Sequence, residues 1–112
     1  MNATTELLLS KLDKGHGNAK RQHELANAMG MSILDTRKAI HSARVDDRVV
    51  ICNLLDGKGY FLPETDEERL AQYRLTVSRG KAVFAQVNAL ITDMGNSGQI
   101  SLEDLIAETE AI

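Results

Sequence analysis

Apolar and polar positions over residues 22–44 repeat with a helical period and predict two short helices joined by a tight turn. The apolar face of the first helix consists of Leu25, Ala26 and Met29. Gly30 can adopt a positive φ and is the predicted end of that helix. Ser32, with Asp35 three positions later, forms a pattern typical of a capping box and is the predicted start of the second helix.

The flanking residues predict three further elements. Leu8, Leu9 and Leu12 indicate a helix before the pair, and Asn18 is a plausible cap for a helix that runs from Ala19 to Met29. After Arg44, the run of residues 49–52 predicts a strand, the Asp-Gly pair at 56–57 a hairpin turn, and residues 60–62 the returning strand. The fold class expected from this order is mainly α with a small β-hairpin (α+β).

The spacing of five residues resembles a helix-turn-helix DNA-binding motif; these are Ala26, Gly30, Met31, Arg37 and Ile40. With the hairpin that follows, residues 4–63 resemble a winged helix-turn-helix domain, and residues 59–63 are similar to small winged proteins of bacteriophage and prophage genomes. Thr36 stands where such motifs carry Val or Ile, so its hydroxyl needs a partner if it is buried. The alternative is a pair of packed helices without the motif's function.

The resemblance implies a recognition helix in the major groove of double-stranded DNA and a wing, residues 54–60, on the backbone. The residues that it assigns to DNA binding are Lys20, Arg21, Leu34, Arg37, Lys38, His41, Arg44 and Lys58. Arg37 could instead turn back to an acid such as Glu24. Winged domains also bind proteins, so fold alone does not decide the partner.

Residues 64–94 predict one long helix that is capped by Thr65 and carries an a/d heptad seam. The seam residues assigned to dimerisation are Leu70, Tyr73, Val77, Gly80, Phe84, Val87 and Ile91, and Met94 continues the pattern. We expect a homodimer through a coiled coil, because this helix is longer than a small domain is wide; packing on the head is the alternative. Gly80 indicates a kink or a close helix crossing.

The sequence therefore divides into three predicted parts: a winged head at 1–63, a dimerisation helix at 64–94, and a tail at 95–112. The tail begins with a turn at 95–98 and contains a short amphipathic helix capped by Ser101. Whether this tail packs on its own chain, swaps onto a partner or stays mobile is open at this point.

Charge is distributed unevenly along the chain. The net charge is −3, but residues 1–62 carry nine cations and seven anions, whereas residues 63–112 carry four cations and nine anions. The mildly basic head fits a DNA-binding transcription regulator or phage accessory factor, although the pI near 5.5 argues against strong non-specific DNA binding. The acidic C-terminal half supports the alternative of a module that binds and modulates a host or phage protein.

Several functional classes lack their sequence signals. No apolar run is long enough to span a bilayer, and we expect a cytoplasmic protein with no membrane association. The three histidines lack the i, i+4 spacing of a helical zinc site, and the single Cys52 is expected to be a small buried hydrophobe. Nucleophile-elbow and phosphate-loop motifs are missing, so we expect no enzyme activity, no cofactor and no metal.

Overall fold

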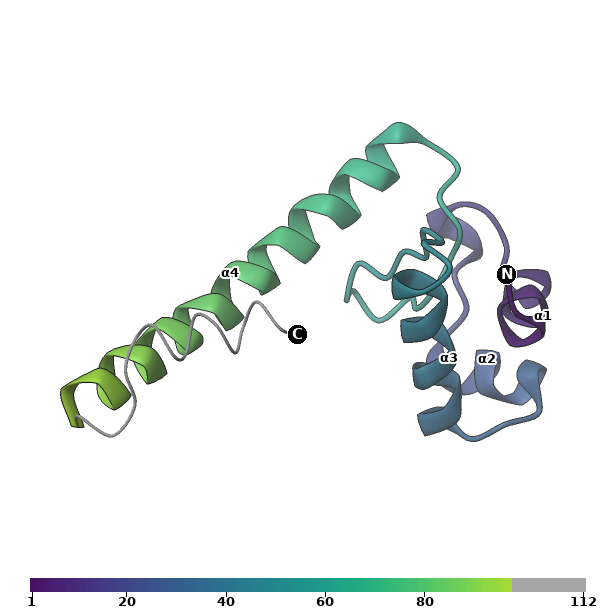
Figure 1. Cartoon of the computed structure of the whole chain (residues 1–112). Coiled ribbons are helices and arrows are strands. Elements are labelled where there is room, and N and C mark those ends of the chain that lie inside the picture. The colour runs from purple at the N-terminus through teal and green to yellow at the C-terminus, as the bar shows by residue number, and fades with distance from the viewer. Residues whose placement is uncertain (98–112) are drawn as a thin grey trace. The chain divides into compact units, whose positions relative to one another are not determined.

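The computed structural model describes residues 1–97, drawn in colour in Figure 1. The chain divides into two compact units, the first comprising Met1–Leu75 and the second beginning at Thr76. The helices are α1 (Ala3–Lys11), the short 3-10 turn η1 (His16–Asn18), α2 (Gln22–Met29), α3 (Ile33–Val45) and α4 (Asp66–Ser97). The first unit therefore contains the start of α4, which the sequence analysis assigned to the dimerisation element.

A single hydrophobic core holds α1, α2 and α3 together in the first unit. Each of these helices contacts the other two, and each contributes residues at the predicted apolar positions. The core cluster consists of Leu8, Leu12, Leu25, Met29, Ile40, Ala43, Ile51 and Tyr60. Cys52 and Phe61 are also fully buried, which confirms the prediction for Cys52, and burial raises the pKa of its thiol.

The turn between α2 and α3 confirms the predicted stop and start signals. Gly30 ends α2 in the left-handed conformation at φ 68°, and the N–H of Met31 donates to the Ala26 carbonyl at 3.2 Å. The Ser32 side chain then accepts from the N–H of Asp35 at 3.0 Å and begins α3. These local bonds determine where α3 starts.

The predicted start of α2 was wrong by three residues. Asn18 closes η1, and α2 begins at Gln22 with Arg21 as an N-cap that makes no side-chain bond. The reason lies in Lys20, whose backbone exchanges hydrogen bonds with Tyr60 at 2.9 and 2.7 Å. This pairing requires an extended backbone at Lys20, and a helix cannot pass through it.

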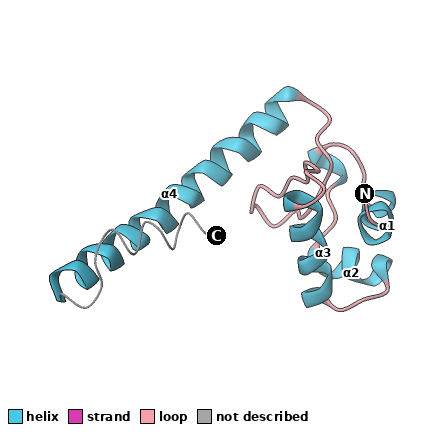
Figure 2. Ribbon diagram, viewed as in Figure 1, coloured by secondary structure: helices cyan, strands magenta, loops and turns pink. Residues whose placement is uncertain are grey.

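The predicted β-hairpin was wrong, and with it the α+β fold class and the winged head. Residues 1–97 form four α-helices and no strand, as Figure 2 shows by the lack of magenta. Only isolated bridges occur, and just one of them, Cys52 with Phe61, joins the two expected strands. Tyr60 and Leu62 instead bridge to residues before α2, namely Lys20 (antiparallel) and Lys14 (parallel).

The start of the expected first strand is also engaged elsewhere. The N–H of Val49 donates to the Ala43 carbonyl at 3.0 Å, so this residue completes the C-terminal end of α3. Arg48 reverses the chain there with a φ of 55°. The Val50 side chain is half exposed rather than part of a sheet face. Residues 46–65 are thus a loop held by tertiary contacts.

The predicted long helix is confirmed: it starts at Asp66, directly after the predicted Thr65 cap, and ends three residues beyond Met94. Thr65 Oγ1 accepts from the N–H of Glu68 at 3.2 Å, and Glu68 Oε1 accepts in return from the Glu64 N–H at 2.8 Å. The expected stop at Gly95 was wrong, because α4 continues to Ser97. A Cβ at Gly80 would meet no atom within 4 Å, so no close crossing is formed with the rest of the described chain. The helix predicted from Ser101 lies outside the described residues.

Candidate nucleic-acid interface

One face of α3 is exposed along the length of the helix. Thr36, Ala39, Ile40 and Ala43 are buried, and helix geometry places Leu34, Lys38, His41 and Val45 on the opposite side, with Arg37 beside them. We call these five exposed residues the α3 stripe. It contains two permanent cations and no carboxylate, and Leu34 and Val45 are each 59% exposed. Val45 was not among the predicted site residues.

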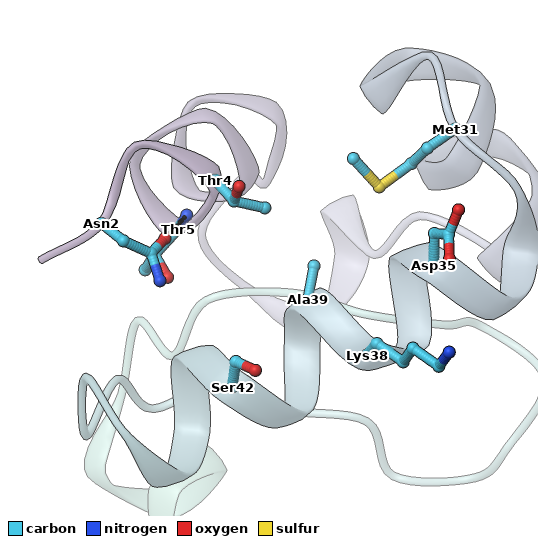
Figure 3. Close-up of a pocket in the computed structure, with 8 residues that line it drawn as sticks. All are labelled: Asn2, Thr4, Thr5, Met31, Asp35, Lys38, Ala39 and Ser42. Atoms are coloured by element: carbon cyan, nitrogen blue, oxygen red, sulfur yellow. Dashed lines mark hydrogen bonds between the residues drawn. The ribbon is translucent and has the colours of Figure 1, made fainter.

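The two cations of the stripe differ in their surroundings. Lys38 points away from α1, as Figure 3 shows, at the edge of a shallow hollow of about 350 Å³ between α1 and α3. Arg37 is exposed, and its Nε donates to Gln22 Oε1 at 3.2 Å. The predicted alternative partner, Glu24, is therefore replaced by the neutral Gln22, two residues earlier on α2, which leaves the guanidinium charge uncompensated by this bond.

Arg44 does not belong to the α3 stripe. Its Nε and Nη2 donate to the Ile51 carbonyl at 3.1 and 2.7 Å, and its guanidinium lies 5.9 Å from the centre of the Tyr60 ring. These contacts satisfy a carbonyl in the core-facing part of the loop. The structure therefore places Arg44 where it holds residues 46–65 against α3.

Lys20 is likewise turned inward. Its Nζ donates to the Lys11 carbonyl at the end of α1 and lies 3.7 Å from Asp13 Oδ2. Since its backbone also pairs with Tyr60, Lys20 connects α1 to the loop that follows α3. Its amino group therefore binds within the head and does not join the α3 stripe, although the sequence analysis assigned both to DNA binding.

Arg21 lines a second shallow hollow of about 350 Å³ between the start of α2 and the loop. Its lining residues are Arg21, Gln22, His23, Asn53, Leu55, Gly57, Gly59 and Tyr60. Lys58 lies between two of these glycines, is exposed, and donates its N–H to Asp56 Oδ1 at 3.0 Å. Gln22 also accepts from Arg37, so this edge of α2 adjoins the α3 stripe.

The loop beside this hollow is anchored by His16, one of the three histidines that the sequence analysis considered and rejected as zinc ligands. His16 Nε2 lies 2.6 Å from Asp56 Oδ2, and its ring meets Phe61 edge to face at 5.4 Å between centroids. The Lys58 N–H and the His16 side chain hold the pKa of Asp56 below its ordinary value. Forty residues separate the pair, so no local spacing signals it.

Glu68 fixes the junction between η1 and α4 in the same way. Its Oε2 accepts from the His16 N–H at 2.7 Å, while Oε1 caps α4 through Glu64 and Thr65. The Glu64 and His16 N–H groups hold the pKa of Glu68 below its ordinary value. The sequence indicated the cap but gave no sign of the second contact.

The residues predicted for dimerisation are largely exposed. Exposed fractions are 45% for Leu70, 65% for Tyr73, 36% for Val77, 65% for Phe84 and 39% for Val87. Gly80 is exposed and Ile91 is partly buried. Val83 and Leu90, which sequence reasoning left out, are each 60% exposed.

Comparison with protein-family models, with curated proteins and with solved structures gives no match. None of the helices in residues 1–97 combines the length and apolarity needed to cross a bilayer. Over the same residues, no three His, Cys, Asp or Glu side chains are grouped so that they could hold a metal ion.

Proposed function

We propose that this chain is a non-enzymatic DNA-binding protein that places α3 in the major groove of double-stranded DNA. The α3 stripe carries this proposal: it combines Arg37 and Lys38 with His41 on the exposed side of a helix whose start is held by the turn at Gly30. Arginine and lysine at such positions bind base edges or phosphates. The role would be transcription regulation or a phage accessory function.

The other predicted DNA-binding residues have two different roles in this proposal, contact with the DNA backbone or positioning of the head's own segments. Arg21, beside Gln22, and Lys58, in the loop whose glycines line the second hollow, contact the DNA backbone. Lys20 and Arg44 act as positioning residues, because their cationic groups already bind carbonyls of the head. The homodimer through α4 supplies two heads, so that a modest positive surface on each reaches useful affinity.

A second candidate function has an observation in its favour. The stripe also exposes Leu34 and Val45, next to Ile33, which is 43% exposed, and apolar side chains of this kind are typical of protein interfaces. The alternative is a module that binds a host or phage protein, with the acidic C-terminal half as a further contact surface.

The salt dependence of binding to random duplex DNA separates the two functions. Fluorescence anisotropy should show affinity that falls steeply with salt, with a log–log slope of about −0.9 for each phosphate neutralised. Replacing Arg37 and Lys38 together by Ala should lower the affinity about 100-fold and make the slope shallower.

Lys14→Ala provides a control, because it removes an exposed cation of the same unit that is not part of α3, and it should leave the affinity nearly unchanged. No binding at low salt would overturn the DNA function and favour the protein-binding alternative. An unchanged affinity of the Arg37 and Lys38 variant would show that another surface binds DNA.

A further inference from the structure

The two sides of the α4 seam differ in polarity. With Val77 and Phe84 at a and Gly80 and Val87 at d, the flanking g positions are Thr76, Val83 and Leu90, and the flanking e positions are Arg74, Lys81 and Asn88. Val83 and Leu90 are as exposed as the seam itself. The uncovered apolar band of α4 is therefore extended on the g side and bounded by polar residues on the e side.

This asymmetry discriminates between the two ways in which a second copy of α4 could cover the band. In a parallel pair, each g residue meets an e residue of the partner, so Val83 would lie beside Asn88 and Thr76 beside Lys81. In an antiparallel pair, g meets g and e meets e. Val83 then lies beside its own counterpart, and Leu90 lies beside Thr76, so the apolar flanks cover each other.

Charge favours the same orientation. Parallel pairing would place Arg69 of each copy beside Arg74 of the other, which gives two like-charge contacts. Antiparallel pairing separates these arginines and brings together only Lys81 and its counterpart, at the exposed rim where salt screens them.

Side-chain size selects the register. One antiparallel register places Val77 opposite Val87 and Gly80 opposite Phe84, so the residue without a side chain faces the largest side chain of the seam. Nothing in the chain's described residues lies within 4 Å of a Cβ built on Gly80, and the Phe84 ring is 65% exposed. A parallel pair would instead face glycine with glycine and leave a void, which close packing disfavours.

We propose that α4 pairs with α4 of a second copy of this chain in antiparallel orientation, in the register that sets Gly80 of each copy against Phe84 of the other. The inference rests on the dimer of the proposed function and adds its geometry. Because α4 has 32 residues, at ~1.5 Å per residue the two helix starts lie about 48 Å apart along the paired axis. The two heads are then attached to opposite ends of the paired helices.

Spin-label distances in the full chain test this orientation. Ser78→Cys and Thr92→Cys both place a label on the outer face of α4, in a Cys52→Ala parent that removes the one native cysteine. At ~1.5 Å per residue, the antiparallel register separates the labels along the axis by about 12 Å at position 78 and about 30 Å at position 92. We expect the measured distance at 92 to exceed that at 78 by roughly 10 Å or more. Equal distances at the two positions would establish a parallel pair and overturn the inference.

A substitution in the otherwise native sequence gives an independent test. Val83→Lys sets two charges against each other in the antiparallel pair and should weaken dimerisation about tenfold or more in sedimentation experiments. Gln86→Lys adds the same charge on the outer face and should leave dimerisation unchanged. A monomeric native chain, or equal effects of both variants, would overturn the inference.

DNA titration of the same samples keeps the two proposals distinguishable. A monomer or a parallel dimer that binds duplex DNA overturns the antiparallel register and leaves the DNA function in place. An antiparallel dimer that fails to bind DNA supports the register and overturns the DNA function.

Discussion

Phe61 and Phe84 are the same residue type at predicted apolar positions, yet Phe61 is fully buried in the first unit and Phe84 is 65% exposed on α4. Leu25 and Leu70, also at predicted apolar positions, show the same contrast, with exposed fractions of 0% and 45%. The head's core residues are covered by its own chain, whereas the described part of α4 leaves its seam residues largely exposed. Apolar periodicity therefore indicates which face of a helix becomes buried, but not what covers it.

The largest expected effect comes from truncating the two phenylalanines. Phe61→Ala should reduce the free energy of unfolding of the head by about 3–5 kcal/mol, because it leaves a cavity in the core. Phe84→Ala should change head stability by less than about 0.5 kcal/mol and should act on self-association instead. Urea unfolding followed at the amide resonances of α2 and α3 measures both. Equal decreases in the free energy of unfolding from the two variants would contradict the difference between the buried head core and the exposed seam of α4.

Substitutions at two glycines of the loop test whether specific backbone contacts stabilise the head. Gly59 has a φ of 100°, and a Cβ there would overlap the Lys20 carbonyl, so Gly59→Ala should destabilise the head by about 3 kcal/mol or more. Gly57 has a φ of 82° but open space around it, so Gly57→Ala should cost only about 1 kcal/mol. Thermal unfolding compares the pair, and similar losses would mean that the Lys20–Tyr60 pairing contributes little.

Acid should weaken the junction between the head and the start of α4. Asp56 and Glu68 have folded pKa values below their unfolded values of about 3.9 and 4.3, so they bind protons less readily when folded. Their contribution to stability is complete above those unfolded values and disappears as pH falls through the lower folded pKa values. Melting temperatures measured from pH 7 to pH 2.5 should therefore decrease below about pH 4.

Glu68→Gln supplies the control for this pH dependence. The amide retains an acceptor for the cap but has no charge to lose, so this variant should melt below the native protein at pH 7 and approach it in acid. Parallel melting curves across the pH range would show that Glu68 does not contribute through its ionised form.

The smallest effect is expected at Thr36. Its Oγ1 donates to the Ser32 carbonyl at 2.8 Å, but that carbonyl also accepts from the Thr36 N–H at 2.9 Å. Thr36→Val removes the hydroxyl and its bond together while keeping the shape, so head stability should change by less than about 1 kcal/mol in either direction. Thr36→Ser, which keeps the hydroxyl and removes a buried methyl, should be the more destabilising of the two in thermal unfolding.

Local signals account for most of what could be predicted. Gly30, Ser32 and Thr65 act within one turn of their own position, so the sequence indicated the turn and the start of α4 correctly. The helix-turn-helix resemblance had pointed to four of the five exposed members of the α3 stripe, all except Val45. Arg44 and Lys20 could not be assigned in the same way, because the carbonyls that bind them lie 7 and 9 residues away in the chain.

By itself, the sequence determined the number and order of the α-helices in the described chain, because capping, helix-ending and periodic apolar positions act over a few residues. The tertiary structure alone decided the path of residues 46–65. The backbone groups of Val49, Tyr60 and Leu62, which could have joined in a hairpin, bond instead to Ala43, Lys20 and Asp13. A backbone donor or acceptor forms its hydrogen bond with whichever segment the packed core brings near it. The local sequence therefore does not determine the partner.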